Sequence, residues 1–192
     1  MTKEKIILGI DEAGRGCLAG PVVAAGVILP NNFDKTVLKD SKILSSRTRL
    51  KLYSIIKSQA LDLKISIINN NLIDKFNILN ATLQAMKDVV IKCKLTPDLV
   101  LIDGNVLPKD LNYPAKAIIR GDSTIPEISA ASIVAKVLRD KLMCRYDRHY
   151  KGYEFKKNKG YGTKSHYNSL SLKGPCPIHR MSFNLNKQLT LF

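Results

Sequence analysis

Short apolar runs bounded by glycine and proline predict five β-strands in this chain. Two of them have the composition of fully buried strands, and a third alternates apolar and polar residues as a strand with one solvated face does. In chain order the runs are Lys5–Asp11, Val22–Leu29, Leu61–Ile68, Val100–Asp103 and Ala115–Ile119.

Between these runs, apolar residues at spacings of three and four predict amphipathic helices. Ser45 or Ser46 is the candidate N-cap of the first helix, the second spans Leu79–Cys93, and the longest runs from Ile128 to His149. Strands first, followed by alternating helices and strands, predict an α/β domain whose mixed central sheet is flanked by helices.

The length of 192 residues favours a single domain. The composition of the chain becomes more basic and aromatic near residue 146, so we expect a catalytic core over approximately residues 1–145 and a basic, helical C-terminal region over 146–192. The longest nearly apolar run, Pro21–Pro30, is about half the length that a membrane-spanning helix needs. No secretory signal is recognised, because Asp11 and Glu12 interrupt the first apolar stretch. The four cysteines are widely spaced, which favours reduced thiols. We therefore expect a cytoplasmic protein without membrane contact.

The charge balance indicates a candidate nucleic-acid-binding protein. Lysine and arginine number 31 against 16 aspartates and glutamates, which leaves a net charge of +15 and favours a polyanionic partner. Between Lys136 and Lys164, ten basic residues are interleaved with five aromatic ones: Tyr146, Tyr150, Tyr153, Phe155 and Tyr161. Such a segment suits phosphate contact with stacking, although a solvated helix face with tyrosines packed on the core has the same composition.

Four acidic residues stand out because each follows an apolar strand: Asp11, Glu12, Asp103 and Asp122. In open α/β sheets, functional groups gather where strands end. Four carboxylates brought together repel one another unless a cation lies between them, and hard ions such as Mg²⁺ or Mn²⁺ prefer these oxygens. Two such ions are the usual apparatus for phosphodiester cleavage. The alternative is that strand-end aspartates cap helices or form turns.

The segment Gly14–Ala19 matches the dinucleotide-binding pattern G-x-G-x-x-G/A, but the context excludes that function. The pattern requires a helix to begin within it, whereas Gly20-Pro21 and a β-branched run follow here. The glycines still allow the backbone to approach a sugar or phosphate closely.

Taken together, these residues resemble bacterial ribonuclease HII. The matching blocks follow that family's order over nearly the whole chain: DEAGRG (11–16), LAGPVVAA (18–25), KDSK (39–42), IDGN (102–105), GDS (121–123), AASIVAKVLRD (130–140), GYGT (160–163) and PIHRMSF (177–183). The resemblance implies a ribonuclease H-like fold in a monomeric, metal-dependent endonuclease. Such an enzyme cuts the RNA strand of RNA–DNA hybrids and nicks duplex DNA on the 5′ side of embedded ribonucleotides, leaving 3′-hydroxyl and 5′-phosphate ends.

The same resemblance assigns roles to particular residues. It implies that the four carboxylates bind two Mg²⁺ or Mn²⁺ ions and that the backbone of Gly14-Arg15-Gly16 recognises the ribose 2′-hydroxyl. It also implies that Tyr161 packs on the neighbouring sugar, that Lys42 supports the substrate phosphates, and that residues 146–192 extend the substrate-binding surface.

Two positions depart from the family pattern, and neither is a carboxylate. Cys17 stands where proline is expected after Gly14-Arg15-Gly16, which we call the glycine loop, and Lys39 stands where asparagine is usual. Loop rigidity and local substrate contacts are therefore the properties that these departures put in question. Of the histidines, His149 is expected to end the longest helix, and His179 is expected to be a packed or hydrogen-bonding residue rather than a base.

The segment Gln188-Leu189-Thr190-Leu191-Phe192 resembles the QLxLF-type motif by which bacterial proteins dock on the DNA polymerase sliding clamp. An extended segment of this kind places Leu191 and Phe192 in a hydrophobic pocket, with Gln188 at its edge. The alternative is that it packs on its own domain near residues 177–183.

Two other functions compete with a ribonuclease. A nuclease of similar fold, such as a junction resolvase or transposase core, shares acidic strand ends but lacks the GRG and GYGT blocks. A non-catalytic nucleic-acid-binding protein explains the charge, but four carboxylates on a phosphate-binding face weaken binding unless metal is present. Metal-dependent cleavage of a duplex containing one ribonucleotide distinguishes all three.

Overall fold

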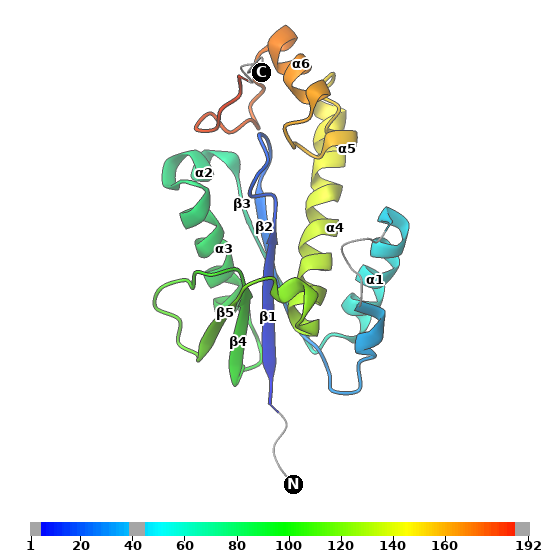
Figure 1. Cartoon of the computed structure of the whole chain (residues 1–192), viewed down its shortest axis with the longest axis vertical. Coiled ribbons are helices and arrows are strands. Elements are labelled where there is room, and N and C mark those ends of the chain that lie inside the picture. Colours follow the sequence, from blue (N-terminus) through cyan, green and yellow to red (C-terminus); the bar gives the residue numbers. More distant parts are fainter. Residues whose placement is uncertain (1–4, 39–44, 187–192) are drawn as a thin grey trace.

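A five-stranded mixed sheet forms the centre of the structure, a computed structural model that describes residues 5–38 and 45–186 (Figure 1). The strand order is β3-β2-β1-β4-β5, with β1 antiparallel to β2 and parallel to β4. The strands are β1 (Ile7–Ala13), β2 (Val22–Ile28), β3 (Asp62–Ile68), β4 (Leu99–Asp103) and β5 (Ala115–Ile118). All five predicted strands are confirmed, with small differences at their ends.

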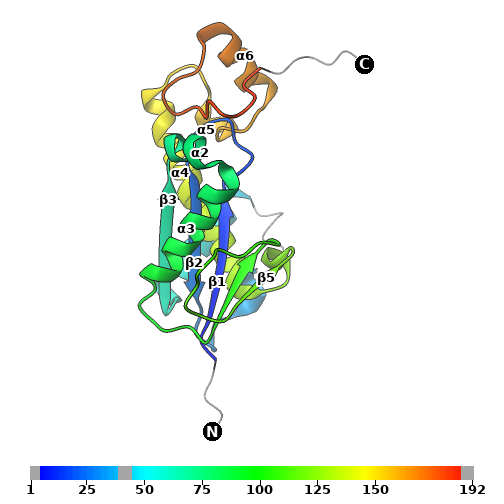
Figure 2. The same cartoon turned by 90° about the vertical axis from the view of Figure 1, so that its left-hand side faces the viewer.

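Helices cover both faces of this sheet. Figures 1 and 2 show α2 and α3 on one face and α4 with α1 on the other. The helices are α1 (Ser46–Gln59), α2 (Asn70–Phe76), α3 (Ile78–Lys92), α4 (Pro126–His149), α5 (Phe155–Asn158) and α6 (Lys164–Lys173), with short 3-10 helices η1 (Lys35–Leu38) and η3 (Gly121–Ser123). Ser45 caps α1 by accepting a hydrogen bond from the amide of Thr48, and α4 is the longest helix of the described residues and ends at His149, both as expected. None of these helices is long and apolar enough to cross a membrane.

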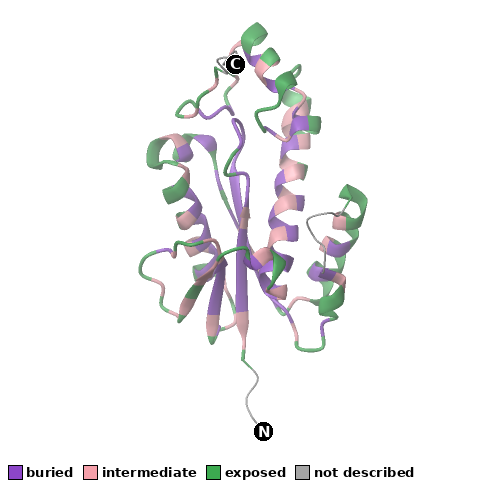
Figure 3. Cartoon of the chain, viewed as in Figure 1, coloured by how far each residue is buried: buried purple, intermediate pink, exposed green. Residues whose placement is uncertain are grey.

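Strands β1 and β2 are buried along most of their length between these helices (Figure 3). Leu8 and Ile10 pack in the cluster under α3, whereas Ala25 and Val27 pack in the cluster under α4 and α1. Gly9 explains how closely α4 approaches β1: a Cβ atom built there would lie 2.2 Å from the backbone carbonyl carbon of Glu127. This close packing brings α4 alongside the strand that carries Asp11.

A third apolar cluster joins the end of α4 to the C-terminal segment and to the loop after β1. Its buried members are Leu18, Ala19, Met143, Tyr153, Phe155, Leu170 and Ile178. Tyr153 and Phe155 stack at 5.4 Å between ring centroids, so for these two aromatics the core-packing interpretation is correct. Within the same cluster, His179 is buried and its Nε2 lies 3.0 Å from Nε2 of His166, which confirms the hydrogen-bonding role expected of it.

Asp62, at the start of β3, fixes the connection between α3 and β4. Its carboxylate forms an ion pair with Lys64 and accepts hydrogen bonds from the Lys94 amide at 2.6 Å and the Cys93 thiol at 3.3 Å. Burial alone would raise the pKa of Asp62, but these hydrogen bonds outweigh it and lower the pKa to about 2. Since the folded state binds the proton less tightly than the unfolded chain, the stabilisation is complete above pH about 4 and is lost as the pH falls towards 2.

We therefore expect Asp62→Asn to lower the free energy of unfolding by about 2 kcal/mol at neutral pH. Urea unfolding at pH 7 and at pH 3 measures this, and the difference between mutant and wild type should shrink at the lower pH. Asp110→Asn is the matched control. Asp110 also pairs with a lysine, at 3.6 Å between its Oδ2 and Lys87 Nζ, but its side chain is exposed, so the loss of stability should be small. Equal losses in the two variants would contradict the assignment.

Candidate active site

Asp11 and Asp103 lie on neighbouring parallel strands at the same level of the sheet. Ile10 of β1 pairs with Ile102 of β4, so the next residue of each strand is one of these aspartates. Asp103 is the last residue of β4, as the sequence predicted, whereas Asp11 and Glu12 lie inside β1. The sheet register therefore brings together two carboxylates that are 92 residues apart in the chain.

The electrostatics of Asp11 and Glu12 reflect this crowding. Asp11 is buried, and this burial together with the negative charges of Glu12 and Asp103 raises its pKa well above the usual value, against a hydrogen bond from Ser132 of α4. Burial also raises the pKa of Glu12, opposed by Arg15, whose Nη1 lies 3.3 Å from Glu12 Oε1. Unneutralised negative charge is thus disfavoured at this position.

Asp103 and Asp122 meet through the short helix η3. Asp103 Oδ1 accepts hydrogen bonds from the amides of Gly121 at 2.7 Å and Asp122 at 3.4 Å. Asp103 therefore does have the capping contacts that the alternative interpretation requires, and the same contacts bring Asp122 to it. Within residues 5–38 and 45–186, no three His, Cys, Asp or Glu side chains are already arranged to hold a metal ion.

The loop after β1 is enclosed by two segments from the C-terminal part of the chain. The amide of Leu18 donates to Gly160 O and the amide of Gly20 donates to Ile178 O, both at 2.8 Å. Cys17 is buried and forms an isolated bridge with Tyr161. Cys17, which stands in place of the expected proline, is thus part of the backbone contact between the loop after β1 and the GYGT segment.

Two fully buried arginines fix this loop, and neither was predicted from the sequence. Arg180 donates to the carbonyl oxygens of Gly14, Arg15 and Gly20, at 2.7, 2.8 and 3.0 Å. Arg139 of α4 donates to the carbonyls of Ala19, Pro21 and Lys159. Both arginines lie in blocks that carry the family resemblance, but their burial has no signature in the sequence.

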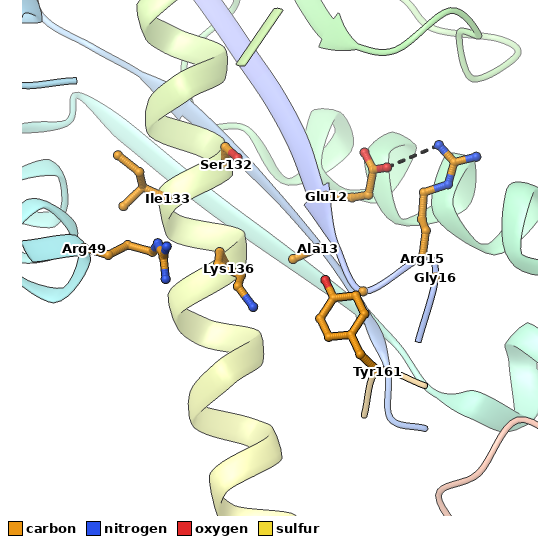
Figure 4. A pocket seen from close by; sticks show the side chains of 10 residues that line it. Glu12, Ala13, Arg15, Gly16, Arg49, Ser132, Ile133, Lys136 and Tyr161 are labelled. Carbon is orange, nitrogen blue, oxygen red and sulfur yellow. Dashed lines mark hydrogen bonds and ion pairs between the residues drawn. The ribbon is translucent and has the colours of Figure 1, made fainter. Parts of the chain in front are cut away.

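A pocket of about 340 Å³ lies between the loop residues Gly14–Gly16, the helix α4 and Tyr161 (Figure 4). Its described lining includes Glu12 and the loop residues 13–16, but not Asp11, Asp103 or Asp122. Three cationic side chains reach it: Arg15, Arg49 and Lys136. The last two were not predicted as site residues, and Lys136 Nζ lies 5.5 Å from the centre of the Tyr161 ring.

Tyr161 is the exception among the aromatics of the basic segment, because 40% of it remains exposed at this pocket. Lys39, Lys42 and the segment 188–192 lie outside the described residues. Glu12, residues 14–16, α4 and Tyr161 line this pocket, and Asp11 precedes Glu12 in β1 beside Asp103 of β4.

Comparison with known proteins gives one consistent family. The sequence matches the family model described as Ribonuclease HII over residues 8–186. It is 52% identical to a Ribonuclease HII of Endomicrobium trichonymphae over 178 residues, which cover 93% of this chain and 85% of that protein. It is 47% identical to a Ribonuclease HII of Chlorobium chlorochromatii over 188 residues, which cover 95% and 91%.

The fold has a solved counterpart in the RNase HII of Archaeoglobus fulgidus, whose structure was determined as a PCNA:RNase HII complex. The TM-score is 0.78 at 22% sequence identity, over 96% of this chain and 98% of that one. This likeness confirms the predicted ribonuclease H-like α/β fold.

Proposed function

The chain belongs to the ribonuclease HII family of endoribonucleases that act on RNA–DNA hybrids, and we propose that its four strand-end carboxylates form the catalytic site. The observation that carries the assignment is the register that sets Asp11 beside Asp103, with the pKa of Asp11 raised. Structural capping alone does not require a buried carboxylate, Asp11, to lie at the same level of the sheet as the carboxylate of a neighbouring strand.

The donor set fits divalent cations. Carboxylate oxygens are the preferred ligands of Mg²⁺ and Mn²⁺, and the mutual repulsion that raises the pKa of Asp11 is what a bound cation relieves. Activity of this family depends on divalent metal ions, and we propose a two-ion site on Asp11, Glu12, Asp103 and Asp122. Bound there, such ions would supply an activated water and would neutralise charge on the leaving 3′-oxygen.

The chain's own groups orient the substrate around this centre. We propose that the backbone of Gly14-Arg15-Gly16 recognises the ribose 2′-hydroxyl, which is the group that separates RNA from DNA. Arg49 and Lys136 line the same pocket and suit phosphate contacts. Residues 146–192, together with Lys42, extend the surface for the duplex, and the protein acts as a cytoplasmic monomer.

Cleavage of three matched duplexes tests this function: an RNA–DNA hybrid, a DNA duplex with one ribonucleotide, and the same duplex in DNA alone. Each is incubated with Mg²⁺, with Mn²⁺ and with EDTA, and the product ends are mapped. We expect metal-dependent cuts in the first two only, on the 5′ side of the single ribonucleotide, with 3′-hydroxyl and 5′-phosphate ends. Cleavage of all-DNA duplex, or cleavage in EDTA, would contradict the proposal.

Tyr161→Ala should lower cleavage at a single ribonucleotide by roughly tenfold or more, because a stacked ring contributes about 1–3 kcal/mol. The side chain is partly exposed, so the melting temperature should change little. Tyr161→Phe keeps the ring and is the control. A Tyr161→Ala variant that loses affinity for all-DNA duplex in the same proportion would make this residue a general stacking surface instead.

We also propose that residues Gln188–Phe192 dock on the DNA polymerase sliding clamp. The QLxLF-type sequence supports this, as does the complex with PCNA in which the fold relative from Archaeoglobus fulgidus was solved. A tether of this kind raises the local concentration of the enzyme at newly made DNA.

Deleting residues 188–192 should abolish clamp binding, measured by surface plasmon resonance, and leave the melting temperature and the cleavage rate on short duplexes unchanged. Leu191→Ala with Phe192→Ala should reproduce the loss without shortening the chain. A clear fall in melting temperature, with no clamp binding by the intact protein, would instead show that the segment packs on its own domain.

A further inference from the structure

Arg180 makes an unusual set of contacts for a buried cation. Its guanidinium is fully buried and donates to three backbone carbonyls of the loop between β1 and β2, at Gly14, Arg15 and Gly20. Its own amide donates to Leu18 O at 2.9 Å, so the backbone around it is anchored to the same loop. Burial lowers the pKa of Arg180 to about 10, and the side chain therefore stays protonated at neutral pH.

These contacts determine where two peptide groups point. In a planar trans peptide, the N–H is directed opposite to the C=O of the preceding residue. Because Arg180 fixes the carbonyls of Gly14 and Arg15, the amide N–H groups of Arg15 and Gly16 are directed away from it. Within the described residues, neither of these N–H groups donates a hydrogen bond to another group of the protein.

The same two residues line the pocket next to Glu12 and Tyr161. A Cβ atom built on Gly16 would meet no atom within 4 Å, so the backbone is open to a ligand at this point. Two unpaired donors, fixed in direction and beside open space, suit an acceptor oxygen of the substrate.

We propose that Arg180 is a positioning residue for ribose selection, which directs the amide N–H groups of Arg15 and Gly16 at the 2′-hydroxyl of the ribonucleotide. The inference rests on the proposed function of the pocket, and it adds a residue that does not touch the substrate itself. Its role is positioning, rather than attraction of the anionic duplex, because the side chain is fully buried and its Nε, Nη1 and Nη2 atoms each donate a hydrogen bond to the loop.

Arg139 provides an internal contrast. It fixes the carbonyls of Ala19 and Pro21, but the amide that follows Ala19 belongs to Gly20 and donates to Ile178 O at 2.8 Å. The contacts of Arg139 therefore brace the loop, whereas those of Arg180 leave two donors available.

The test compares wild type, Arg180→Lys and Tyr153→Phe in EDTA, where duplexes stay intact. Arg180→Lys keeps the charge but cannot span three carbonyls. Tyr153→Phe removes a buried hydrogen bond to Gly174 O in the same C-terminal cluster and leaves the loop untouched. The quantity measured is the ratio of dissociation constants for all-DNA duplex and for the duplex with one ribonucleotide.

We expect this ratio to fall roughly tenfold in Arg180→Lys, which corresponds to loss of one to two hydrogen bonds, with little change in affinity for all-DNA duplex. Tyr153→Phe should keep the wild-type ratio. An unchanged ratio in Arg180→Lys, or an equal fall in Tyr153→Phe, would overturn the inference while wild-type cleavage still supports the proposed function. Failure of the wild-type protein to cleave the duplex with one ribonucleotide would instead contradict the proposed function.

A second measurement uses the unaltered protein and keeps the inference open to refutation if Arg180→Lys does not fold. Amide chemical shifts of Arg15 and Gly16 are followed by NMR as each duplex is added. The inference requires larger shifts with the ribonucleotide duplex than with all-DNA duplex. Identical shifts with both would overturn it.

Discussion

Asp103→Asn should abolish cleavage and leave the fold in place. The amide oxygen of asparagine can still accept the hydrogen bonds from Gly121 and Asp122, so η3 stays anchored. The lost negative charge weakens cation binding, and since such electrostatic stabilisation amounts to several kcal/mol, the rate should fall roughly a thousandfold or more. Turnover on a single-ribonucleotide duplex, with circular dichroism as the check on folding, measures both effects.

Asp11→Asn should be equally inactive but should raise the melting temperature of the metal-free protein. The substitution removes a buried charge whose pKa is raised by burial and by its acidic neighbours, so its removal relieves an unfavourable interaction. Mn²⁺ should stabilise wild type more than it stabilises either variant. Wild-type turnover by Asp11→Asn or Asp103→Asn would exclude the proposed metal site.

The sequence predicted the sheet and the longer helices because their apolar periods are long and uninterrupted. The helix α3 begins at Ile78, one residue before the predicted start, since Asn77 accepts a hydrogen bond from the Asn80 amide and caps it. The preceding helix α2 was not predicted, because its seven residues are too few to establish a period.

The carboxylates were predictable for a physical reason, and the arginines were not. Asp11 and Asp103 each follow a strand that is recognisable from its apolar residues, and strand ends converge in an α/β sheet. The partners of Arg139 and Arg180 are backbone carbonyls, which every residue possesses, so no residue type marks the contact. Arg49 and Lys136 escaped notice because they are two of 31 basic residues.

Gly14→Ala should destabilise the protein by about 3 kcal/mol or more and eliminate ribonuclease activity. Gly14 has φ of +103°, a conformation that L side chains rarely adopt. An added Cβ would also lie 2.0 Å from Nε of Arg139 and 2.8 Å from Pro21 O. Arg139 and the Pro21 carbonyl to which it donates would have to shift, and thermal unfolding should show the loss of stability directly.

Gly16→Ala is the matched substitution, with the opposite expectation for the fold. Gly16 lies two residues away in the same loop, does not have positive φ, and has open space where the methyl group would go. The melting temperature should therefore match that of wild type, but the methyl group extends towards the pocket where the backbone is proposed to approach the ribose. KM for the single-ribonucleotide duplex should rise roughly tenfold, as expected when a close backbone contact is blocked. Wild-type KM in Gly16→Ala would mean that the substrate does not approach this peptide closely, so this pair of variants distinguishes a glycine required by the protein from one required by its substrate.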